Sequence, residues 1–388
     1  MYFLPSVEDS SFSSMLRILH IARYRNKMLE SKVKFMSQDA DFLFFLVRPK
    51  QYEDAYGSLT LHSTTTKTDN ILHLSLIGKH IDPHRVLYGS LSFSMKSFKP
   101  DIIHAEDEPD SLAALQVLSA RRLFAPKAKL ILHTWQNINR KKRPLVQWVT
   151  NRALQGSDAI LCSNVEGVEV LHAMGFNGLT DIIPPEGVDI EWFKPSGQKQ
   201  QKNGFTLLYA GRFVEEKGLD ILLEALSLTR NQASLVLVGD GPLKDTLKEQ
   251  ANRLKINEQV QFLPPVEQDS MPSLYAQADT LVLSSRGTPV WKEQYGRVLL
   301  EAMACKVPVI GSDSGAIPEV IGDAGLIFKE NDAGSLAQCI QNLIENPTLQ
   351  KDLAERGYKR VTSFYSQKEI ARRTNDFYRK IMDSKHLE

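Results

Sequence analysis

The sequence predicts an α/β protein built from two parallel-sheet domains. The chain has 388 residues, which is enough for two domains of ordinary size. Short apolar runs alternate with helical stretches, as is typical of a parallel sheet covered on both faces. A polar, proline- and glycine-containing stretch at 184–204 interrupts this alternation. We therefore expect domains over 1–195 and 196–365, with a C-terminal helix, about 366–388, that joins the first domain.

Composition narrows the class of protein. Hydrophobic residues make up 42% and charged residues 24% of the chain, as in ordinary soluble proteins. The net charge of +1 gives no strong attraction to nucleic acid or membrane, so no nucleic-acid partner is expected. Cys162, Cys305 and Cys339 are far apart and show no metal-ligand spacing, which favours a reduced, cytoplasmic protein. The N-terminus does not read as a signal peptide, and no stretch approaches the ~18 apolar residues of a spanning helix.

The first half of the chain contains six expected strands. They are residues 16–22, 42–47, 100–104, 129–133, 158–162 and 180–184. Residues 52–85 give no clear pattern, with an exposed loop or edge hairpin around Thr64. Ligands of such sheets bind beyond the carboxyl ends of the strands. The candidate ligand-binding residues there are Arg23, Glu106, Glu108, His133, Trp135 and Gln136.

The second half repeats this pattern. Its expected strands are residues 206–210, 235–238, 259–263, 280–283, 307–311 and 325–328. The first strand leads into Gly211, and Arg212 and Lys217 follow in the same loop. Two fixed cations beyond a strand end suit a diphosphate, which an arginine can grip with its planar fork. Gly239–Pro242, in contrast, has the residues of a simple turn between strand and helix.

A further loop carries two carboxylates around a helix start. Glu293 stands before an expected helix, Gln294, Tyr295 and Gly296 lie in the loop, and Glu301 lies more than one turn inside. The unpaired amides of a first helical turn carry partial positive charge and bind hydroxyls or phosphate oxygens readily. The two carboxylates would contact different parts of one extended ligand, such as a sugar joined to a nucleotide. The alternative is a helix start merely stabilised by a nearby glutamate.

Taken together, these loops resemble those of a known enzyme family. The matching stretches are GRFVEEKG at 211–218, LVGDGP at 237–242 and EQYGRVLLEAMACKVPVIGSDSGAIPEVI at 293–321. Residues 204–365 resemble the nucleotide-sugar-binding half of the retaining glycosyltransferases of family 4. That family has the GT-B fold, two Rossmann-like domains facing each other across a cleft. IIHAEDEP and LHTWQNI in the first half resemble a bacterial branch of it, so the resemblance covers nearly the whole chain beyond the first dozen residues.

The resemblance implies roles for the residues of the second domain. Glu293 would hold hydroxyls of the donor sugar, supported by the amides of Gln294, Tyr295 and Gly296. Glu301 would bind the ribose. We expect no cofactor and no metal, because fixed cations and a helix dipole can stabilise the charge on a departing nucleoside diphosphate. Those cations are Arg212 and Lys217, beside Gly211.

Two features depart from the family pattern. The loop after the first strand, Arg23–Lys27, lacks the glycines that many relatives have there. Many relatives also have a histidine in the turn after a strand end of the first domain. That position falls here nearer Trp135, so His133 is read equally as the end of a strand. The contacts of the first domain, the acceptor-binding one, with donor and acceptor therefore follow less directly from the resemblance.

Nine basic residues and no acidic one lie between Asp110 and Asp158. They are Arg121, Arg122, Lys127, Lys129, Arg140, Lys141, Lys142, Arg143 and Arg152. The stretch is read either as a solvated surface or as a contact with an anionic acceptor or the inner face of the membrane.

The sequence thus predicts a retaining hexosyltransferase of polysaccharide or glycan biosynthesis. It would move a hexose from a UDP- or GDP-sugar to a glycan or lipid-linked acceptor, without a metal. One alternative is a catalytically silent partner subunit that binds a sugar nucleotide. Another is a dinucleotide oxidoreductase, which the missing Gly-x-Gly-x-x-Gly after the first strand disfavours.

Overall fold

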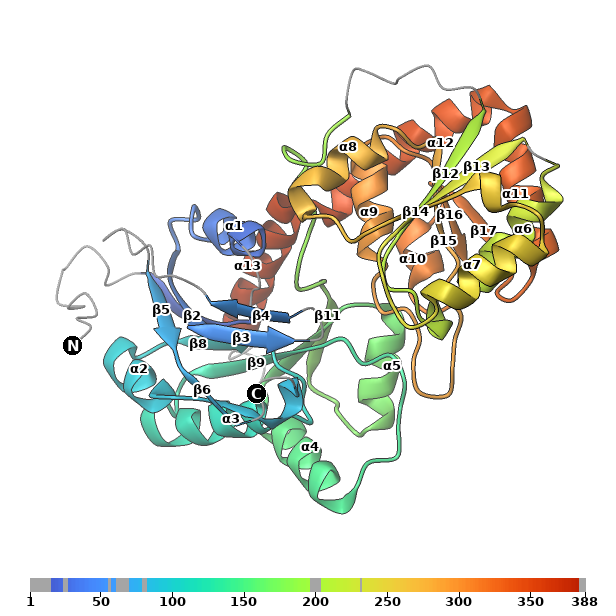
Figure 1. Cartoon of the computed structure of the whole chain (residues 1–388). Coiled ribbons are helices and arrows are strands. Elements are labelled where there is room, and N and C mark those ends of the chain that lie inside the picture. The colour runs from blue at the N-terminus through green and yellow to red at the C-terminus, as the bar shows by residue number, and fades with distance from the viewer. Residues whose placement is uncertain are drawn as a thin grey trace. The chain divides into compact units, whose positions relative to one another are not determined.

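The chain forms two compact units in the computed structural model, which describes residues 15–23, 27–54, 57–60, 70–78, 82–195, 204–230 and 232–383 (Figure 1). Unit 1 comprises residues 1–187 and 367–388, and unit 2 comprises residues 188–366. The sequence placed this boundary at 195. The glycine-free loop, at residues 24–26, the Thr64 loop and the linker residues 196–203 lie outside the described residues.

Unit 1 is built on a seven-stranded sheet in the order β11-β10-β9-β8-β1-β2-β5, with every neighbouring pair parallel. Its strands are β1 (Leu16–Ile21), β2 (Phe42–Pro49), β5 (Ile71–Leu74), β8 (Ile102–Ala105), β9 (Lys129–Thr134), β10 (Ala159–Cys162) and β11 (Leu179–Ile182). Each of the six expected strands is present, and the predicted parallel α/β architecture is confirmed for this unit.

Two antiparallel pairs lie in and directly beside residues 52–85, which show no clear pattern in the sequence. They are β3 (Gln51–Asp54) with β4 (Gly57–Thr60), and β6 (Leu76–Gly78) with β7 (Val86–Tyr88), the latter preceded by the 3-10 turn η2 (Pro83–Arg85). These strands have only three or four residues each. So short a strand shows little alternation, and its pattern is hard to recognise in sequence.

Helices cover both faces of the unit 1 sheet. They are α1 (Lys27–Met36), α2 (Leu91–Phe98), α3 (Leu112–Phe124), α4 (Pro144–Gly156), α5 (Val165–Ala173) and α13 (Gln367–Asp383). Successive strand residues point to opposite faces, so Ile18 packs with α1 and α13 while Leu19 packs with α2 and α3. The C-terminal helix therefore belongs to the core of unit 1.

Unit 2 contains a six-stranded sheet in the order β14-β13-β12-β15-β16-β17, again with every neighbouring pair parallel. Its strands are β12 (Phe205–Ala210), β13 (Ala233–Val238), β14 (Val260–Leu263), β15 (Thr280–Leu283), β16 (Val309–Ser312) and β17 (Leu326–Phe328). All six were expected from the sequence. Two doubly wound sheets in one chain are thus confirmed.

The helices of unit 2 follow the strands in the expected alternation (Figure 1). They are α6 (Leu219–Leu228), α7 (Lys244–Arg253), α8 (Met271–Tyr275), α9 (Arg297–Ala304), α10 (Ile317–Ile321), α11 (Ala333–Glu345) and α12 (Pro347–Arg360). Shorter turns are η3 (Glu215–Lys217), η4 (Asn257–Gln259) and η5 (Gln268–Ser270), with a π-helical turn η6 (Val361–Tyr365).

Each sheet reverses its winding direction at one place. In unit 1 the chain winds from β1 through β2 to β5, and then returns to β8 on the other side of β1. In unit 2 it winds from β12 to β14 and returns to β15 beside β12. In open α/β sheets, ligands bind beyond the carboxyl ends of the strands at such a switch point. A ligand of unit 2 is therefore expected to bind at the loops after β12 and β15.

Candidate functional site

The loops after β12 and β15 are locked together at the switch point of unit 2. The first runs from Gly211 to Gly218 and ends in the turn η3. Gly218 has φ 60°, and a Cβ there would lie 2.1 Å from the carbonyl oxygen of Ser284. Only glycine combines this left-handed conformation with so close an approach. The Ser284 hydroxyl in turn donates to the Lys217 carbonyl over 2.9 Å, so the backbone position of Lys217 is fixed.

The carboxylate of Glu293 is the centre of this arrangement. Its Oε2 accepts from Lys217 Nζ at 2.6 Å and from Ser285 Oγ at 2.9 Å. Its backbone carbonyl accepts from the amide of Ala316 at 2.9 Å. Glu293 is 8% exposed. The carboxylate is therefore held by Lys217 and Ser285, while the loop after β16 holds the backbone of Glu293.

Trp291 lies against the same lysine. The ammonium of Lys217 is 4.7 Å from the centre of the Trp291 ring, within the range of a cation–π contact. Backbone hydrogen bonds between Thr288 and Trp291 close the turn that carries the tryptophan. An apolar ring thus flanks a cation and a carboxylate, a combination well suited to a sugar, which has both hydroxyls and apolar C–H faces.

Helix α9 starts directly beside this pair. Gly296 precedes it with φ 66° and ψ 46°, a left-handed conformation that favours glycine, and no side chain caps the helix start. The first amides of α9 have no partner within the helix and carry its partial positive charge. Gln294 and Tyr295 lie just before it, and the Tyr295 ring is 6.3 Å from that of Tyr365. An anion or hydroxyl can bind at this end.

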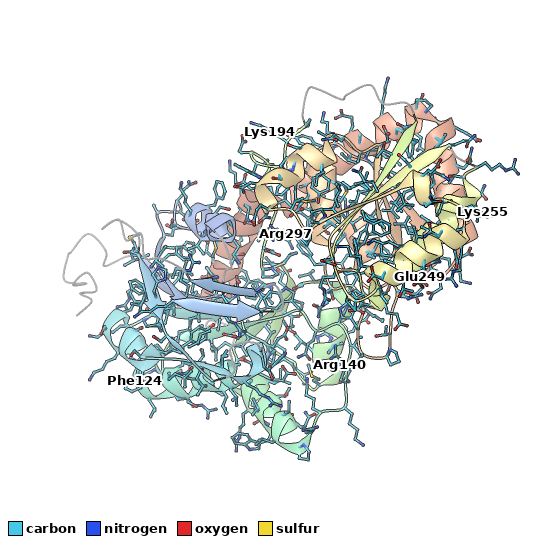
Figure 2. All side chains as sticks on the ribbon, viewed as in Figure 1. Phe124, Arg140, Lys194, Glu249, Lys255 and Arg297 are labelled. Atoms are coloured by element: carbon cyan, nitrogen blue, oxygen red, sulfur yellow. The ribbon has the colours of Figure 1, made fainter. Side chains whose placement is uncertain are left out.

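Glu301 is held inside α9 at both carboxylate oxygens. Oε1 accepts from Arg297 Nε and Oε2 from the hydroxyl of Tyr275, each at 2.8 Å. Arg297 is labelled in Figure 2. Glu301 is 4% exposed, and burial together with this carboxylate raises the pKa of Tyr275 well above its ordinary value, so the phenol keeps its proton. Tyr275 therefore acts as a donor to Glu301.

Arg212 lies in the same loop as Lys217 but with a more exposed head group. Its guanidinium is 3.5 Å from the carboxylate of Glu216 and its side chain is 42% exposed. Its backbone carbonyl accepts from the Tyr209 hydroxyl at 2.8 Å. A surface ion pair of this kind is weak and can open. Among the described residues, the structure thus brings Glu293 into contact with Lys217, while Arg212 contacts a neighbouring carboxylate.

In unit 1, the residues after β8 and β9 form a second group. Arg23 contacts Asp107 over 2.5 Å. The carboxylate of Glu108 accepts from Thr134 Oγ1 at 2.6 Å and from the amide of Trp135 at 2.7 Å. Burial raises the pKa of Glu108 to about 7. This carboxyl group joins the ends of two adjacent strands.

The other candidates of unit 1 differ in accessibility. Gln136 is partly buried, and its side-chain carbonyl accepts from Lys142 at 3.1 Å. Glu106 and His133 are only 5% and 1% exposed. Glu106 forms an ion pair with the equally buried Lys32. These two residues lie within the interior of unit 1 and not on its surface.

Several residues that contact the predicted site residues were not predicted from the sequence. Ser285 and Trp291 lie in the loop after β15, and their position after an expected strand could have identified them. Tyr275 and Lys32 carry no such signal, because a tyrosine and a lysine within helices have many ordinary roles. Only the fold places Tyr275 beside Glu301 and Lys32 beside Glu106.

The basic stretch is divided between internal pairs and open surface. Arg121 and Lys129 pair with Asp158, and Lys142 pairs with Asp110. The loop before α4 and the first turns of the helix are exposed, including Arg140, which Figure 2 labels. Among the described residues, no helix is long and apolar enough to cross a membrane.

Comparison with known proteins relates this geometry to a family. The family model described as glycosyl transferases group 1 matches residues 190–360. An N-acetyl-alpha-D-glucosaminyl L-malate synthase of Bacillus anthracis is 34% identical over 46% of this chain and 47% of its own length. A GDP-mannose-dependent alpha-(1-6)-phosphatidylinositol monomannoside mannosyltransferase of Mycobacterium tuberculosis is 28% identical over 69% of this chain and 74% of its own. The chain thus spans about half the length of the first relative and about three quarters of the second.

Solved structures extend the likeness to both units. An Anabaena protein crystallised with UDP has a TM-score of 0.73 and 19% identity, covering 94% of this chain and all of that one. The same protein has also been crystallised with UDP-glucose. At this identity the likeness concerns the fold alone, and it confirms the predicted two-domain GT-B architecture.

Proposed function

We propose that the chain, whose residues 190–360 match the family model of the glycosyl transferases group 1, moves a hexose from a UDP- or GDP-sugar to a glycan or lipid-linked acceptor. The observation that carries this proposal is the Lys217–Glu293 pair at the switch point of unit 2, beside the start of α9. The names of the relatives are consistent with it, since one uses GDP-mannose and a structural neighbour was crystallised with UDP-glucose.

The carboxylates of Glu293 and Glu301 each bind a different part of the donor in the proposed reaction. Glu293 accepts hydrogen bonds from the hydroxyls of the donor sugar, and Trp291 packs against its C–H face. Glu301, held by Tyr275 and Arg297, accepts from the ribose hydroxyls. Because both carboxylates are fixed in advance, they orient the donor without reorganisation.

The bond to the sugar breaks as negative charge develops on the diphosphate. Lys217, Arg212 and the amides at the start of α9 stabilise that charge, typically the largest single contribution to catalysis. The exposed pair between Arg212 and Glu216 opens, so that the arginine can reach the phosphate. With this supply of positive charge, we propose that the reaction proceeds without a metal ion.

We further propose that the transfer retains the configuration of the sugar. Glu293 is already held by Lys217 and Ser285, and in the proposed complex it also binds sugar hydroxyls. It is therefore a positioning carboxylate and not a covalent nucleophile. The acceptor hydroxyl then attacks the anomeric carbon on the face that the diphosphate leaves, and its proton passes to the departing diphosphate oxygen.

A membrane-bound acceptor fits the surface of α4. Its first turns expose Leu145 at 72% and Trp148 at 48%, and three exposed basic residues precede or begin it. They are Arg140, Lys141 and Arg143. Basic groups attract anionic headgroups, while the apolar side chains enter the interface. We propose that this surface brings unit 1 to the inner face of the membrane.

A turnover assay tests the enzyme proposal. The protein is incubated with UDP-, GDP- and ADP-hexoses, and release of the free nucleoside diphosphate is followed by mass spectrometry. We expect turnover of a UDP- or GDP-sugar that Glu293→Gln abolishes and the exposed-surface control Glu249→Gln leaves unchanged (Figure 2). Binding without turnover of any sugar nucleotide, with candidate acceptors present, would instead identify a silent partner subunit.

Vesicle sedimentation tests the membrane proposal. We expect binding to vesicles containing anionic lipid and little binding to neutral ones. Leu145→Glu should abolish the binding, whereas Lys255→Glu, on the exposed surface of unit 2, should not (Figure 2). Equal binding of both variants would exclude α4 as the contact.

A further inference from the structure

Three histidines and a glutamate lie together on one face of the unit 1 sheet. In the parallel register, His20 is opposite His104, and Ala105 is opposite Leu132. Side chains alternate along each strand. His20, His104 and His133 therefore project to the same face, the one covered by α1 and α13, and Glu106 follows His104 by two residues. The rings of His104 and His133 are stacked at 5.7 Å.

The imidazoles have nitrogens that are buried and lack partners. His104 and His133 are 0% and 1% exposed. Among the described residues, Nε2 of His104 has no hydrogen-bond partner, and the His133 ring makes no well-formed hydrogen bond, its polar neighbour being the backbone of Ile183. A buried polar atom without a partner is costly, and its presence in a native structure indicates an occupant such as a water molecule or an ion.

The unpartnered atoms converge on the carboxylate of Glu106. One ligand atom each from His104, Glu106 and His133 can be chosen so that all three lie within 4.8 Å of one another. Around a zinc ion with bonds of about 2.0–2.2 Å, tetrahedral ligand atoms lie roughly 3.4 Å apart. The three groups therefore need to close by about an ångström or a little more, which small rotations of the side chains provide.

Neighbouring residues already orient these ligands. The hydroxyl of Tyr378, on α13, is 2.8 Å from His104 Nδ1, which leaves Nε2 directed at the cluster. Lys32 and His20 both contact Oε1 of Glu106. Metal-binding histidines and carboxylates commonly have such outer partners, which fix their orientation.

We propose that His104, Glu106 and His133 bind a divalent transition-metal ion, with Zn²⁺ the favoured one. Two imidazoles and one carboxylate suit zinc, cobalt and related ions, whereas magnesium and calcium prefer oxygen ligands. The ion joins β8 to β9 beneath α1 and α13 and so has a structural role in unit 1. It takes no part in the diphosphate chemistry assigned to Lys217 and Arg212, so the metal proposal stands apart from the proposed function.

Lys32 sets the condition under which the ion binds. Its ammonium contacts Glu106 and also donates to the Pro185 carbonyl over 2.5 Å. Two cations cannot share one buried carboxylate oxygen at low cost. The incoming ion therefore takes the other carboxylate oxygen or displaces the ammonium toward Pro185. Zinc affinity is expected to be lower than that of a site without the lysine.

Metal analysis of the full-length protein tests this proposal. Protein made without a histidine tag is stripped with chelator, reloaded with Zn²⁺ or Co²⁺ and dialysed, and its metal content is measured by mass spectrometry. We expect one ion per chain, tetrahedral Co²⁺ absorption and no binding of Mg²⁺. His133→Gln and His104→Gln should each weaken Zn²⁺ binding at least tenfold, whereas His172→Gln, exposed on α5, should not.

Two results would overturn it. One is a folded wild-type protein that holds no stoichiometric Zn²⁺ or Co²⁺ after reloading, in which case a buried water is the occupant. The other is unchanged Zn²⁺ binding in both His133→Gln and His104→Gln. If one of these variants does not fold, the other and the Co²⁺ spectrum of the wild type decide the outcome, since a surface-bound ion would not give the tetrahedral spectrum.

Discussion

Each unit contains a lysine–glutamate pair near the switch point of its sheet, and the two pairs differ in burial. Lys217 and Glu293 in unit 2 have side chains that are 15% and 11% exposed. Lys32 and Glu106 in unit 1 have side chains that are 1% and 4% exposed. A serine and a tryptophan contact the first pair, and a histidine and a backbone carbonyl contact the second.

This difference separates a pair that can serve a ligand from one that holds the interior together. A partly open pair can exchange its contacts for hydroxyls or phosphate oxygens at modest cost. A sealed pair does so only at high cost, because removing either partner without a replacement leaves an uncompensated charge in a medium of low polarity. Under the proposed function, the same two residue types therefore serve catalysis in unit 2 and structure in unit 1. The following predictions test this distinction, in order of decreasing effect.

The largest effect is expected on stability, from the sealed pair. Lys32→Met should lower the free energy of unfolding by about 3–5 kcal/mol, because it leaves the buried Glu106 carboxylate without its cation. Lys217→Met should lower it by about 1 kcal/mol or less, as expected for pairs near solvent. Urea unfolding of both variants measures the two values. Equal losses would remove the distinction between the pairs.

The open pair should dominate activity. Lys217→Met is expected to reduce kcat about 10²–10³-fold, because it removes a fixed charge that stabilises the departing diphosphate. Lys255→Met, on the exposed surface of unit 2, serves as the matched control. Steady-state kinetics with the donor identified by the turnover assay gives the comparison. Retention of wild-type kcat by Lys217→Met would contradict the proposed role.

A smaller effect, on donor binding, is expected from Tyr275, which contacts Glu301. Tyr275→Phe removes only the hydroxyl that donates to Glu301 at 2.8 Å and keeps the packing of the ring. A hydrogen bond to a charged group contributes about 1.5–3 kcal/mol, so KM for the donor should rise about 10–100-fold with a smaller change in kcat. Tyr358→Phe, on α12, is the control. A loss of kcat at unchanged KM would indicate that Tyr275 does not act through donor binding.

The smallest effect concerns pH and Glu108. Its pKa is raised to about 7 in the folded protein, above its ordinary value of 4.5, mainly by burial. The folded state therefore holds a proton that the unfolded state has lost, and stability falls as pH rises from about 5 to 7. Relative to Glu108→Gln, the wild type should lose roughly 1 kcal/mol over this range, since solvent screens a partly exposed carboxyl. Urea unfolding at several pH values tests this, and a pH-independent difference would contradict it.

Most of the two sheets and the loops of unit 2 could be predicted from the sequence alone. Long apolar strands such as 42–47 and 206–210 have strong hydrophobic patterns, because the faces of such strands are buried in the sheet. Glu293 and Glu301 could be placed around one helix start because they lie eight residues apart in the chain. Arg212 and Lys217 could be added because they follow a strand end.

The pairings between distant residues could not be predicted. Glu106 was recognised as a residue beyond a strand end, but its contacts come from Lys32 and His20, more than 70 residues away. Tyr378 reaches His104 across 274 residues. Such contacts depend on strand order and register, which no local pattern contains. For the same reason, the histidine cluster showed no metal-ligand spacing in the sequence.

Hydrogen–deuterium exchange of the full-length protein tests the central claim most directly. The exchange is measured with and without UDP-glucose and GDP-mannose at saturating concentration. Binding of a donor at the switch point of unit 2 should slow exchange in the peptides covering 211–218 and 293–301, and leave the peptide around Glu249 unchanged. A donor that is turned over while both stretches exchange as fast as before would contradict the assignment of the donor site to Lys217, Glu293 and the start of α9.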